Sequence, residues 1–205
     1  MPASPILALE RVRKVYRRGL FDRAPAFQLD LDLAFDRPEI VGVMGPNGAG
    51  KTTFFEMIAG SNAPTAGRVV VQGQDMQKLR YRQRDRLAIH YHQSYQVRRF
   101  SKRVPEFLLQ STASAYPVVH LFDEPQFNTQ DGYIGFMLDF FRRLRAEGRL
   151  VFVCLHPTAG FQLDILREIC ERFLFVSGGK AEGFGDYEGL VGNSGVRRYL
   201  GTLAP

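Results

Sequence analysis

A glycine-rich segment followed by a lysine and two threonines has the composition of a phosphate-binding loop. Its spacing, Gly-x-x-x-x-Gly-Lys-Thr, lets consecutive backbone N–H groups point at an anion, and the N-terminus of a following helix favours negative charge. Lys51 can reach the β- and γ-phosphates of a bound nucleotide, and the Thr52 hydroxyl can ligate Mg²⁺. The residues that we expect to bind phosphate are Gly45, Pro46, Asn47, Gly48, Ala49, Gly50, Lys51, Thr52 and Thr53.

Two acids and a histidine follow apolar stretches further along the chain. Asp123 and Glu124 end the first stretch, where Asp123 is suited to hold Mg²⁺ and Glu124 to polarise an attacking water. Paired acids at the end of a strand can also simply cap a following helix. His156 follows the second stretch, 150–155, and is placed to contact the terminal phosphate or the water. With Lys51, Glu124 and His156 are the candidate catalytic residues.

The elements that must position these side chains follow from the hydrophobic pattern. From Glu39 onward, short apolar runs alternate with helical patterns, which predicts βαβ units and a largely parallel sheet. The expected strands are 40–44, 68–71, 118–122, 150–155 and 173–176, and the expected helices are 51–59, 105–115, 132–147 and 162–172. Apolar residues alternate at period two from Phe27 to Phe35, which predicts a half-buried antiparallel strand with 6–16 as its partner.

Composition agrees with a single α/β domain over residues 1–205. The chain is 45% hydrophobic and 23% charged, which is typical of globular proteins and excludes a largely disordered chain. It has no uninterrupted apolar run of membrane-spanning length, and its start lacks the features of a signal peptide, so we expect a cytoplasmic protein. Cys154 and Cys170 are too few for a disulfide framework, and we interpret both as core residues.

Positive charge is concentrated in two stretches, although the whole chain carries only +6. The stretch 78–103 holds nine Lys and Arg against one acid, and the stretch 11–23 holds six against one. Such an excess suits anionic lipid headgroups, nucleic acid or an acidic protein face, and it is equally typical of a solvated surface.

Four segments in order resemble the nucleotide-binding domain of ABC transporters. They are 39–53, 64–69, 122–125 and 155–156, and the resemblance extends over nearly the whole chain. It implies a P-loop NTPase fold, a RecA-like parallel core with an antiparallel β subdomain, that binds ATP with Mg²⁺.

The resemblance also assigns roles to residues that the spacing alone leaves open. It places Tyr16 where the family has the aromatic residue that stacks on adenine, and Gln93 where it has the glutamine that senses Mg²⁺ and the membrane subunit. Without the resemblance, Tyr16 is simply a strand residue and Gln93 a polar loop residue. The metal-binding candidates are therefore Thr52, Gln93 and Asp123. The tail 196–201 is similar to those of lipopolysaccharide-export and branched-chain amino-acid transport ATPases.

The chain departs from the family where a helical subdomain carries the Leu-Ser-Gly-Gly-Gln signature. Only 30 positions separate Gln93 from Asp123, which is too short for that subdomain, and the signature occurs nowhere in the sequence. In the nearest remnant, 100–104, Lys102 and Arg103 replace the two glycines. Glycine is needed where backbone approaches phosphate closely, so we expect the signature function to be lost. Alternatively the two cations supply charge to the phosphates, but flexible side chains are poorly preorganised donors.

Two other segments depart from the pattern or imitate it. The segment 177–179, Ser-Gly-Gly, imitates the signature but follows His156, and we predict that it is a hairpin turn. The loop 126–131 lacks the family's small-Leu-Asp pattern, which normally joins the two active sites of a dimer.

The favoured hypothesis is an ATP-binding subunit of an ABC transporter, bound peripherally at the inner face of the cell membrane. Its partners would be a membrane-spanning subunit and a second ATPase that supplies the intact signature, so that a heterodimer hydrolyses ATP in one composite site. One alternative is a regulatory ATP-binding subunit, against which the intact Glu124 argues. Another is a non-transport ATPase that acts on nucleic acid, although the chain has no recognised nucleic-acid module. In that case the bases of the bound nucleic acid would stack on Tyr81, Tyr91, Tyr95 and Phe100.

Overall fold

The computed structural model describes residues 4–19, 25–92, 117–125, 127 and 133–205. The strands are β1 (Leu7–Tyr16), β2 (Phe27–Phe35), β3 (Ile40–Met44), β4 (Ala66–Val71), β5 (Gln74–Asp75), β6 (Ala88–His92), β7 (Val119–Asp123), β8 (Leu150–Cys154), β9 (Arg172–Ser177) and β10 (Lys180–Phe184). The α-helices are α1 (Lys51–Ala59), α2 (Tyr81–Arg84), α5 (Tyr133–Ala146), α6 (Gly160–Ile169), α7 (Tyr187–Gly192) and α8 (Ser194–Leu200), with 3₁₀ turns η1 (Met76–Lys78) and η2 (Gly201–Leu203). No helix in the described part of the chain is both long and apolar enough to cross a membrane.

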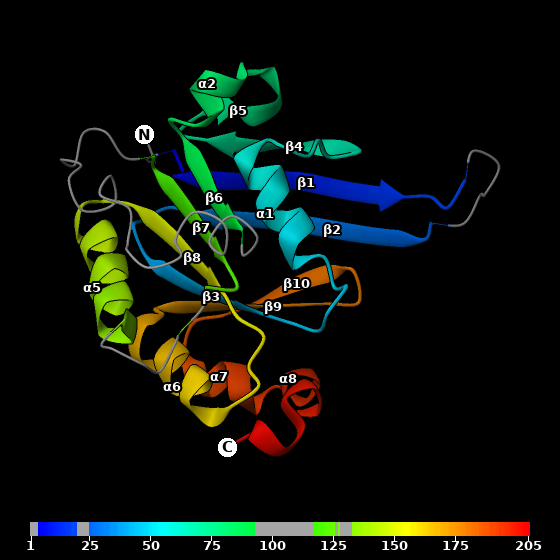
Figure 1. Cartoon of the computed structure of the whole chain (residues 1–205). Helices are drawn as coiled ribbons and strands as arrows, with labels where there is room; N and C mark the ends of the chain where they lie inside the picture. Colours follow the sequence, from blue (N-terminus) through cyan, green and yellow to red (C-terminus); the bar gives the residue numbers. More distant parts are fainter. Residues whose placement is uncertain (1–3, 20–24, 93–116, 126, 128–132) are drawn as a thin grey trace.

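These strands form one sheet in the order β5-β4-β1-β2-β10-β9-β3-β8-β7-β6 (Figure 1). The five strands from β9 to β6 run parallel, and every residue of β3, β7 and β8 is buried, as expected for strands covered on both faces. Helix α1 packs in the core of one face, and α5, α6, α7 and α8 pack in the core of the other. The α/β prediction is confirmed, and the carboxyl ends of β3, β7 and β8 meet at one edge.

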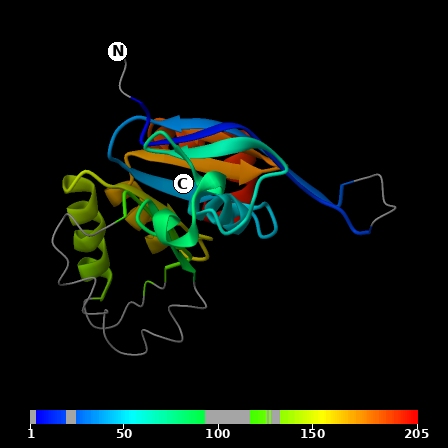
Figure 2. The same ribbon diagram turned by 90° about the horizontal axis from the view of Figure 1, so that it is seen from above.

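The other side of the sheet is antiparallel, as predicted. β1 pairs with both β2 and β4, and the β1–β2 ribbon extends beyond the neighbouring strands (Figures 1 and 2). A bulge interrupts β1 at Arg11, which has a positive φ of 46°, and Gly67 of β4 lies opposite. A Cβ atom at Gly67 would lie 2.2 Å from the Arg11 carbonyl oxygen, so only glycine fits beside the bulge.

Several elements differ from the expected ones, and β5, β10 and α2 were not predicted. Strand β6 was not predicted either, because its five residues lie inside the charge-rich stretch 78–103 and show no clear alternation. Helix α6 ends at Ile169 rather than 172, since the Glu171 N–H donates to the Ile40 carbonyl and the chain enters the sheet at that point. The short α7 and α8 were also missed, and the expected helix 105–115 lies outside the described residues.

The prediction of a hairpin turn over 177–179 is confirmed. Ser177 pairs with Lys180 across the antiparallel β9–β10 pair, and Gly178 and Gly179 have φ values of 55° and 77°. A left-handed conformation at both turn positions is typical of a type I′ turn. The Ser-Gly-Gly sequence therefore forms the turn that joins β9 to β10.

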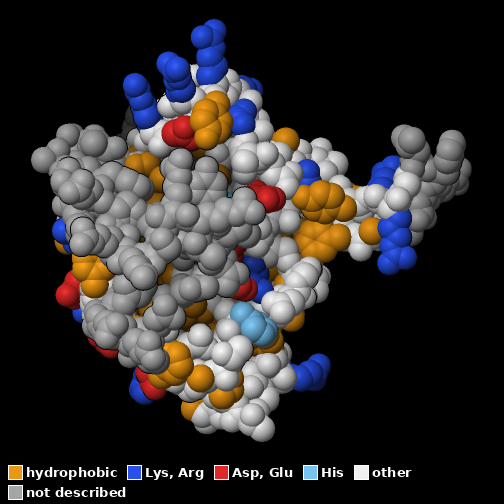
Figure 3. Space-filling model, viewed as in Figure 1, with side chains coloured by type: hydrophobic (Ala, Val, Ile, Leu, Met, Phe, Trp, Pro, Cys, Tyr) orange, Lys and Arg blue, Asp and Glu red, His pale blue; other side chains and the backbone are white. Residues whose placement is uncertain are grey.

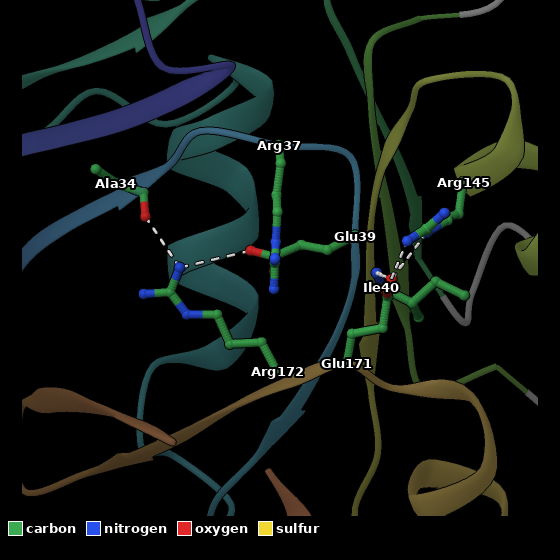
Figure 4. A network of polar contacts seen from close by, with 7 residues as sticks. All are labelled: Ala34, Arg37, Glu39, Ile40, Arg145, Glu171 and Arg172. Atoms are coloured by element: carbon green, nitrogen blue, oxygen red, sulfur yellow. Dashed lines mark hydrogen bonds and ion pairs between the residues drawn. The ribbon is translucent and has the colours of Figure 1, made fainter. Parts of the chain in front are cut away.

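A buried carboxylate anchors the edge of the sheet opposite the phosphate loop (Figure 4). Glu39 precedes β3 and is 2% exposed, and its carboxylate lies 3.4 Å from Arg37 Nε and 3.5 Å from an Arg172 terminal nitrogen. Arg172 also donates to the Ala34 carbonyl at 3.1 Å. The network thus joins the end of β2 to the starts of β3 and β9.

A second ion pair fastens helix α5 to the same edge. Arg145 donates to the Glu171 carboxylate at 2.7 and 3.1 Å, and Glu171 also accepts the Ile40 N–H at 3.2 Å. The hydrogen bond from Arg145 is the main reason that the pKa of Glu171 is lowered. The Arg145 side chain of α5, the backbone of β3 and the Glu171 side chain just before β9 meet here, which holds the helix against the parallel strands (Figure 4).

Candidate nucleotide-binding site

The phosphate loop joins β3 to α1, with its conformation set by two glycines. Gly45 has a φ of 154°, and a Cβ atom there would lie 2.0 Å from the Val176 carbonyl oxygen. Gly50 has a φ of 102° at the N-terminal cap of α1, and the Ala49 N–H donates to the Pro46 carbonyl at 3.2 Å. Residues with a side chain rarely adopt these backbone conformations, which explains the glycines at both ends of the motif.

The lysine of the motif is held inside the loop. Lys51 is 6% exposed, and its Nζ donates to the carbonyl oxygens of Gly45 at 2.7 Å and Pro46 at 3.0 Å. Two carbonyl groups therefore fix the ammonium group beside the backbone that would surround a phosphate. Such a buried cation at the N-terminus of a helix is suited to bind an anion.

The threonine of the motif contacts the first acid of β7. Thr52 Oγ1 donates to Asp123 Oδ2 at 2.8 Å, and Asp123 is 3% exposed. His90 of β6, which the sequence did not single out, lies with Nε2 3.3 Å from the same carboxylate oxygen. A hydroxyl and a carboxylate oxygen are hard ligands of the kind that Mg²⁺ takes together with phosphate oxygens and water. The donor set therefore fits Mg²⁺.

The second acid, Glu124, sits at the point where the chain leaves β7. Its φ of 52° is left-handed, which is uncommon for a residue other than glycine, and its N–H donates to the Cys154 carbonyl at 3.0 Å. Strained residues of this kind cluster at functional sites. Glu124 forms part of the wall of the pocket that contains the phosphate loop.

One pocket of about 310 Å³ brings most of the predicted residues together. Its lining residues are Tyr16, Phe27, Asn47, Gly48, Gly50, Lys51, Thr52, Thr53 and Glu124. All of these except Phe27 were candidates from the sequence. Phe27 was assigned only to a strand, and the cross-strand pairing with Tyr16 that places it here is a tertiary contact without a local signal.

Tyr16 and Phe27 form an aromatic wall beside the phosphate loop. Their ring centroids are 5.9 Å apart, and the Lys14 Nζ lies 4.9 Å from the Tyr16 centroid. Asn62 donates to the Tyr16 hydroxyl at 2.6 Å. Tyr16 is 39% exposed, so part of its ring is available to a planar group. This arrangement suits a base stacked on Tyr16 with its phosphates in the loop.

His156 is not among the residues that line this pocket. His156 follows β8, and its Nδ1 lies 2.8 Å from the hydroxyl of Tyr199 on α8. Gln93 lies outside the described residues, as does the signature remnant around Lys102. Sequence reasoning missed Tyr199, although it lies in the tail singled out for its similarity to two transport families.

Both cysteines are core residues. Cys154 of β8 is fully buried and Cys170 is 9% exposed. Burial raises the pKa of both thiols, and for Cys154 the charge of Asp123 adds to the effect. The thiols are therefore protonated and poorly reactive in the folded chain.

The described part of the basic stretch forms an exposed patch above α2 (Figure 3). Its exposed cations are Lys78, Arg80, Arg82 and Arg86, and Tyr81, Gln83 and the acid Asp85 are exposed among them. Arg84 instead donates to the carbonyl groups of Gly60 and Leu79. Tyr91, considered as a stacking residue for nucleic-acid bases, is 7% exposed and stacks on Phe122 at 4.4 Å. That interpretation of Tyr91 was wrong, because the ring is committed to the core.

A glycine-rich loop between a buried parallel strand and a helix, with acids ending a strand of the same sheet, defines the P-loop class of nucleotide-binding proteins. The ABC transporter family profile matches residues 29–132, and the chain belongs to this family.

Curated relatives differ in their named substrates. The spermidine/putrescine import ATP-binding protein PotA of Thermobifida fusca is 37% identical over 83 residues, covering 40% of this chain. The lipoprotein-releasing protein LolD of Xanthomonas oryzae is 38% identical over 85 residues, covering 42%, and the lipopolysaccharide export protein LptB of Acidithiobacillus ferridurans is 35% identical over 88 residues, covering 43%. The chain spans 21% of the length of PotA and 34% of the lengths of LolD and LptB.

Solved structures share the fold at 16% sequence identity. The ATP-binding subunit of an ABC transporter superposes with a TM-score of 0.67, covering 98% of this chain and all of that chain. An ATP-binding cassette solved as a dimer with ADP and phosphate gives 0.65, covering 87% of this chain and 98% of that one. These similarities confirm the P-loop NTPase fold.

Proposed function

We propose that this chain binds MgATP as the ATP-binding subunit of an ABC transporter. The observation that carries the proposal is the single pocket in which the aromatic wall, the phosphate loop and Glu124 meet. Adenine would stack on Tyr16 and the phosphates would enter the loop above the Lys51 ammonium group. The names of the relatives support the transporter assignment, with the subunit peripheral on the inner face of the cell membrane against a membrane-spanning partner.

Each remaining site residue has a part in this proposal. Thr52 and Asp123 would hold the Mg²⁺ ion, which supplies charge neutralisation for the terminal phosphates when bound. Glu124 would accept a proton from the attacking water, and His156 would donate a hydrogen bond to the terminal phosphate. Gln93 would sense the metal and the membrane subunit, as the resemblance implies.

Hydrolysis would need a second chain. The sequence contains no Leu-Ser-Gly-Gly-Gln, and the nearest remnant replaces both glycines by Lys102 and Arg103. Glycine backbone that could approach a partner's phosphate is thus missing from that position. We infer that a partner ATPase with an intact signature completes the site around Glu124, while this chain cannot complete its partner's site.

The test of the proposed function is MgATP binding by the purified full chain, measured by titration calorimetry. Lys51→Ala should weaken binding at least tenfold, because a charge-assisted hydrogen bond to phosphate is lost, at a cost of about 1.5–3 kcal/mol. Lys78→Ala is the matched control, since that side chain is 80% exposed and lies outside the pocket. Failure of the unaltered chain to bind MgATP, or equal weakening by both substitutions, would contradict the proposal.

A further inference from the structure

The C-terminal helix α8 reaches the site through Tyr199. Val196 and Leu200 are buried on one side of the helix, and Tyr199, three residues after Val196, lies on the same side. Asn193 caps the helix by accepting the N–H groups of Gly195 at 2.9 Å and Val196 at 3.2 Å. The capped and anchored helix therefore holds the tyrosine ring in place.

The Tyr199 ring lies between β9 and His156. Its centroid is 5.5 Å from that of Phe175 and 5.7 Å from that of the His156 imidazole. The hydroxyl oxygen is 2.8 Å from His156 Nδ1, a normal hydrogen-bond distance. Nδ1 is therefore tied to α8, and within the part of the chain that the structure describes Nε2 has no hydrogen-bond partner.

The surroundings of the hydroxyl indicate which partner donates. Burial is the main reason that the pKa of Tyr199 rises to about 12, so the phenol is neutral at physiological pH. A hydrogen bond from the backbone of Gly45, the first residue of the phosphate loop, acts to lower the pKa of Tyr199. A hydroxyl whose oxygen accepts from a backbone N–H still has one proton to give, and Nδ1 lies within reach of it.

We propose that Tyr199 is a positioning residue that donates to His156 Nδ1 and so holds the neutral imidazole in its Nε2–H tautomer. In that form His156 offers an N–H to the terminal phosphate, which rests on the proposed function of ATP binding. Without the hydroxyl, the ring has no fixed tautomer and can present an unprotonated nitrogen, which repels phosphate. The same hydroxyl links α8 to the phosphate loop through Gly45.

The decisive measurement is the tautomer of His156 in the nucleotide-free full chain, read from long-range ¹H–¹⁵N correlations of the imidazole rings. The chain has four histidines, and His156→Gln identifies the relevant signals. We expect an unprotonated Nδ1 and a protonated Nε2 in the unaltered chain, and a mixture of tautomers in Tyr199→Phe. Tyr187→Phe is the matched control on neighbouring α7, where the ring packs on Phe173 at 5.9 Å. A protonated Nδ1 in the unaltered chain, or an unchanged tautomer in Tyr199→Phe, would overturn the proposal.

A binding experiment separates this inference from the proposed function. Tyr199→Phe should weaken MgATP binding about two- to tenfold, the effect of one hydrogen bond, and leave MgADP binding unchanged. Equal affinities for MgATP in Tyr199→Phe and the unaltered chain would count against the role of His156 at the terminal phosphate. If the unaltered chain binds no MgATP, the proposed function fails, whereas the tautomer measurement still decides the role of Tyr199.

Discussion

Gly45 shows how one missing side chain allows two segments to touch. The phosphate loop begins at this residue beside the backbone of β9, the parallel neighbour of β3, so closely that a methyl group would overlap the Val176 carbonyl oxygen. This contact fixes the start of the loop against β9. At Gly48, by contrast, a Cβ atom would meet nothing within 4 Å, although its φ of 76° is also left-handed.

Gly45→Ala should therefore be far more damaging than Gly48→Ala. We expect the first substitution to lower the free energy of unfolding by about 2 kcal/mol, as forced overpacking does, and to weaken MgATP binding at least tenfold. Gly48→Ala should lower the free energy of unfolding by only about 1 kcal/mol, which is the cost of a left-handed conformation for alanine. Urea denaturation and calorimetry measure the two quantities. Similar effects of both substitutions on stability would show that the loop can move away from β9.

The roles of the candidate site residues stay predictions, but a local motif was enough to select residues that lie close together. Lys51, Thr52, Asp123 and Glu124 follow from spacing and from the strand ends. The structure places Lys51, Thr52 and Glu124 around one pocket, with Asp123 hydrogen-bonded to Thr52. His90 and Phe27 were not predicted as site residues, because a residue's neighbour on another strand has no signature in its own sequence. Tyr199 lies 43 positions from His156, and only the folded chain brings the two together.

The pair of strands β6 and β7 contains a buried histidine, His120, beside two aromatic rings. His120 stacks near Tyr91 and Phe122, with centroids 6.0 and 6.3 Å away, and its nitrogens contact the Tyr91 hydroxyl at 3.2 Å and the Pro117 carbonyl at 3.1 Å. Burial lowers its pKa from 6.5 to about 3. The folded chain therefore keeps this imidazole neutral in acid that protonates it in the unfolded chain.

Stability should fall as the pH falls through this window. Below the unfolded pKa of 6.5, unfolding takes up a proton that the native His120 does not accept until about pH 3, so acid favours unfolding. Lowering the pH from 7 to 5 should reduce the free energy of unfolding by about 2 kcal/mol through this group, and urea denaturation measures that change. His120→Phe should remove that part of the slope, whereas Tyr91→Phe should keep it, since burial and not the hydroxyl is the main cause. An unchanged slope in His120→Phe would assign the loss to other groups.

Regular elements were predicted with mixed success. Runs that are buried on both faces, such as β3 and β8, could be located from their apolar character alone. β6 was missed because it shows no clear alternation, and only its pairing with β7 makes it a strand. α6 was extended too far because its end is set by a hydrogen bond to Ile40. Sequence periodicity carries no information on such long-range partners.

At the scale of the whole molecule, the sequence contains the phosphate-loop motif, the paired acids and His156 but no Leu-Ser-Gly-Gly-Gln signature. Family membership was predicted from the order of motifs and is confirmed by the profile match over residues 29–132. The single-domain assignment of 1–205 and the heterodimer stay predictions. Lipoprotein, lipopolysaccharide and polyamine systems all occur among the relatives, so their names do not select one substrate.

Glu124→Gln tests the asymmetry of the proposed complex. In an assembly purified in mild detergent with its membrane subunit and partner ATPase, the substitution should reduce ATP turnover about a hundredfold or more, because it removes the base from the only complete site. Glu188→Gln is the control, since that side chain is 70% exposed on α7. Turnover that survives Glu124→Gln would mean that the partner's site works without a signature from this chain.

The pairing of Tyr16 with Phe27 closes the β1–β2 ribbon immediately before residues 17–26. Residues 17–19, which follow the aromatic wall in the sequence, are exposed and lie outside the lining of the pocket. Arg18 is exposed and only two positions from Tyr16 in the sequence. A fluorophore attached through a cysteine at that position would report occupancy of the pocket optically, without occupying it.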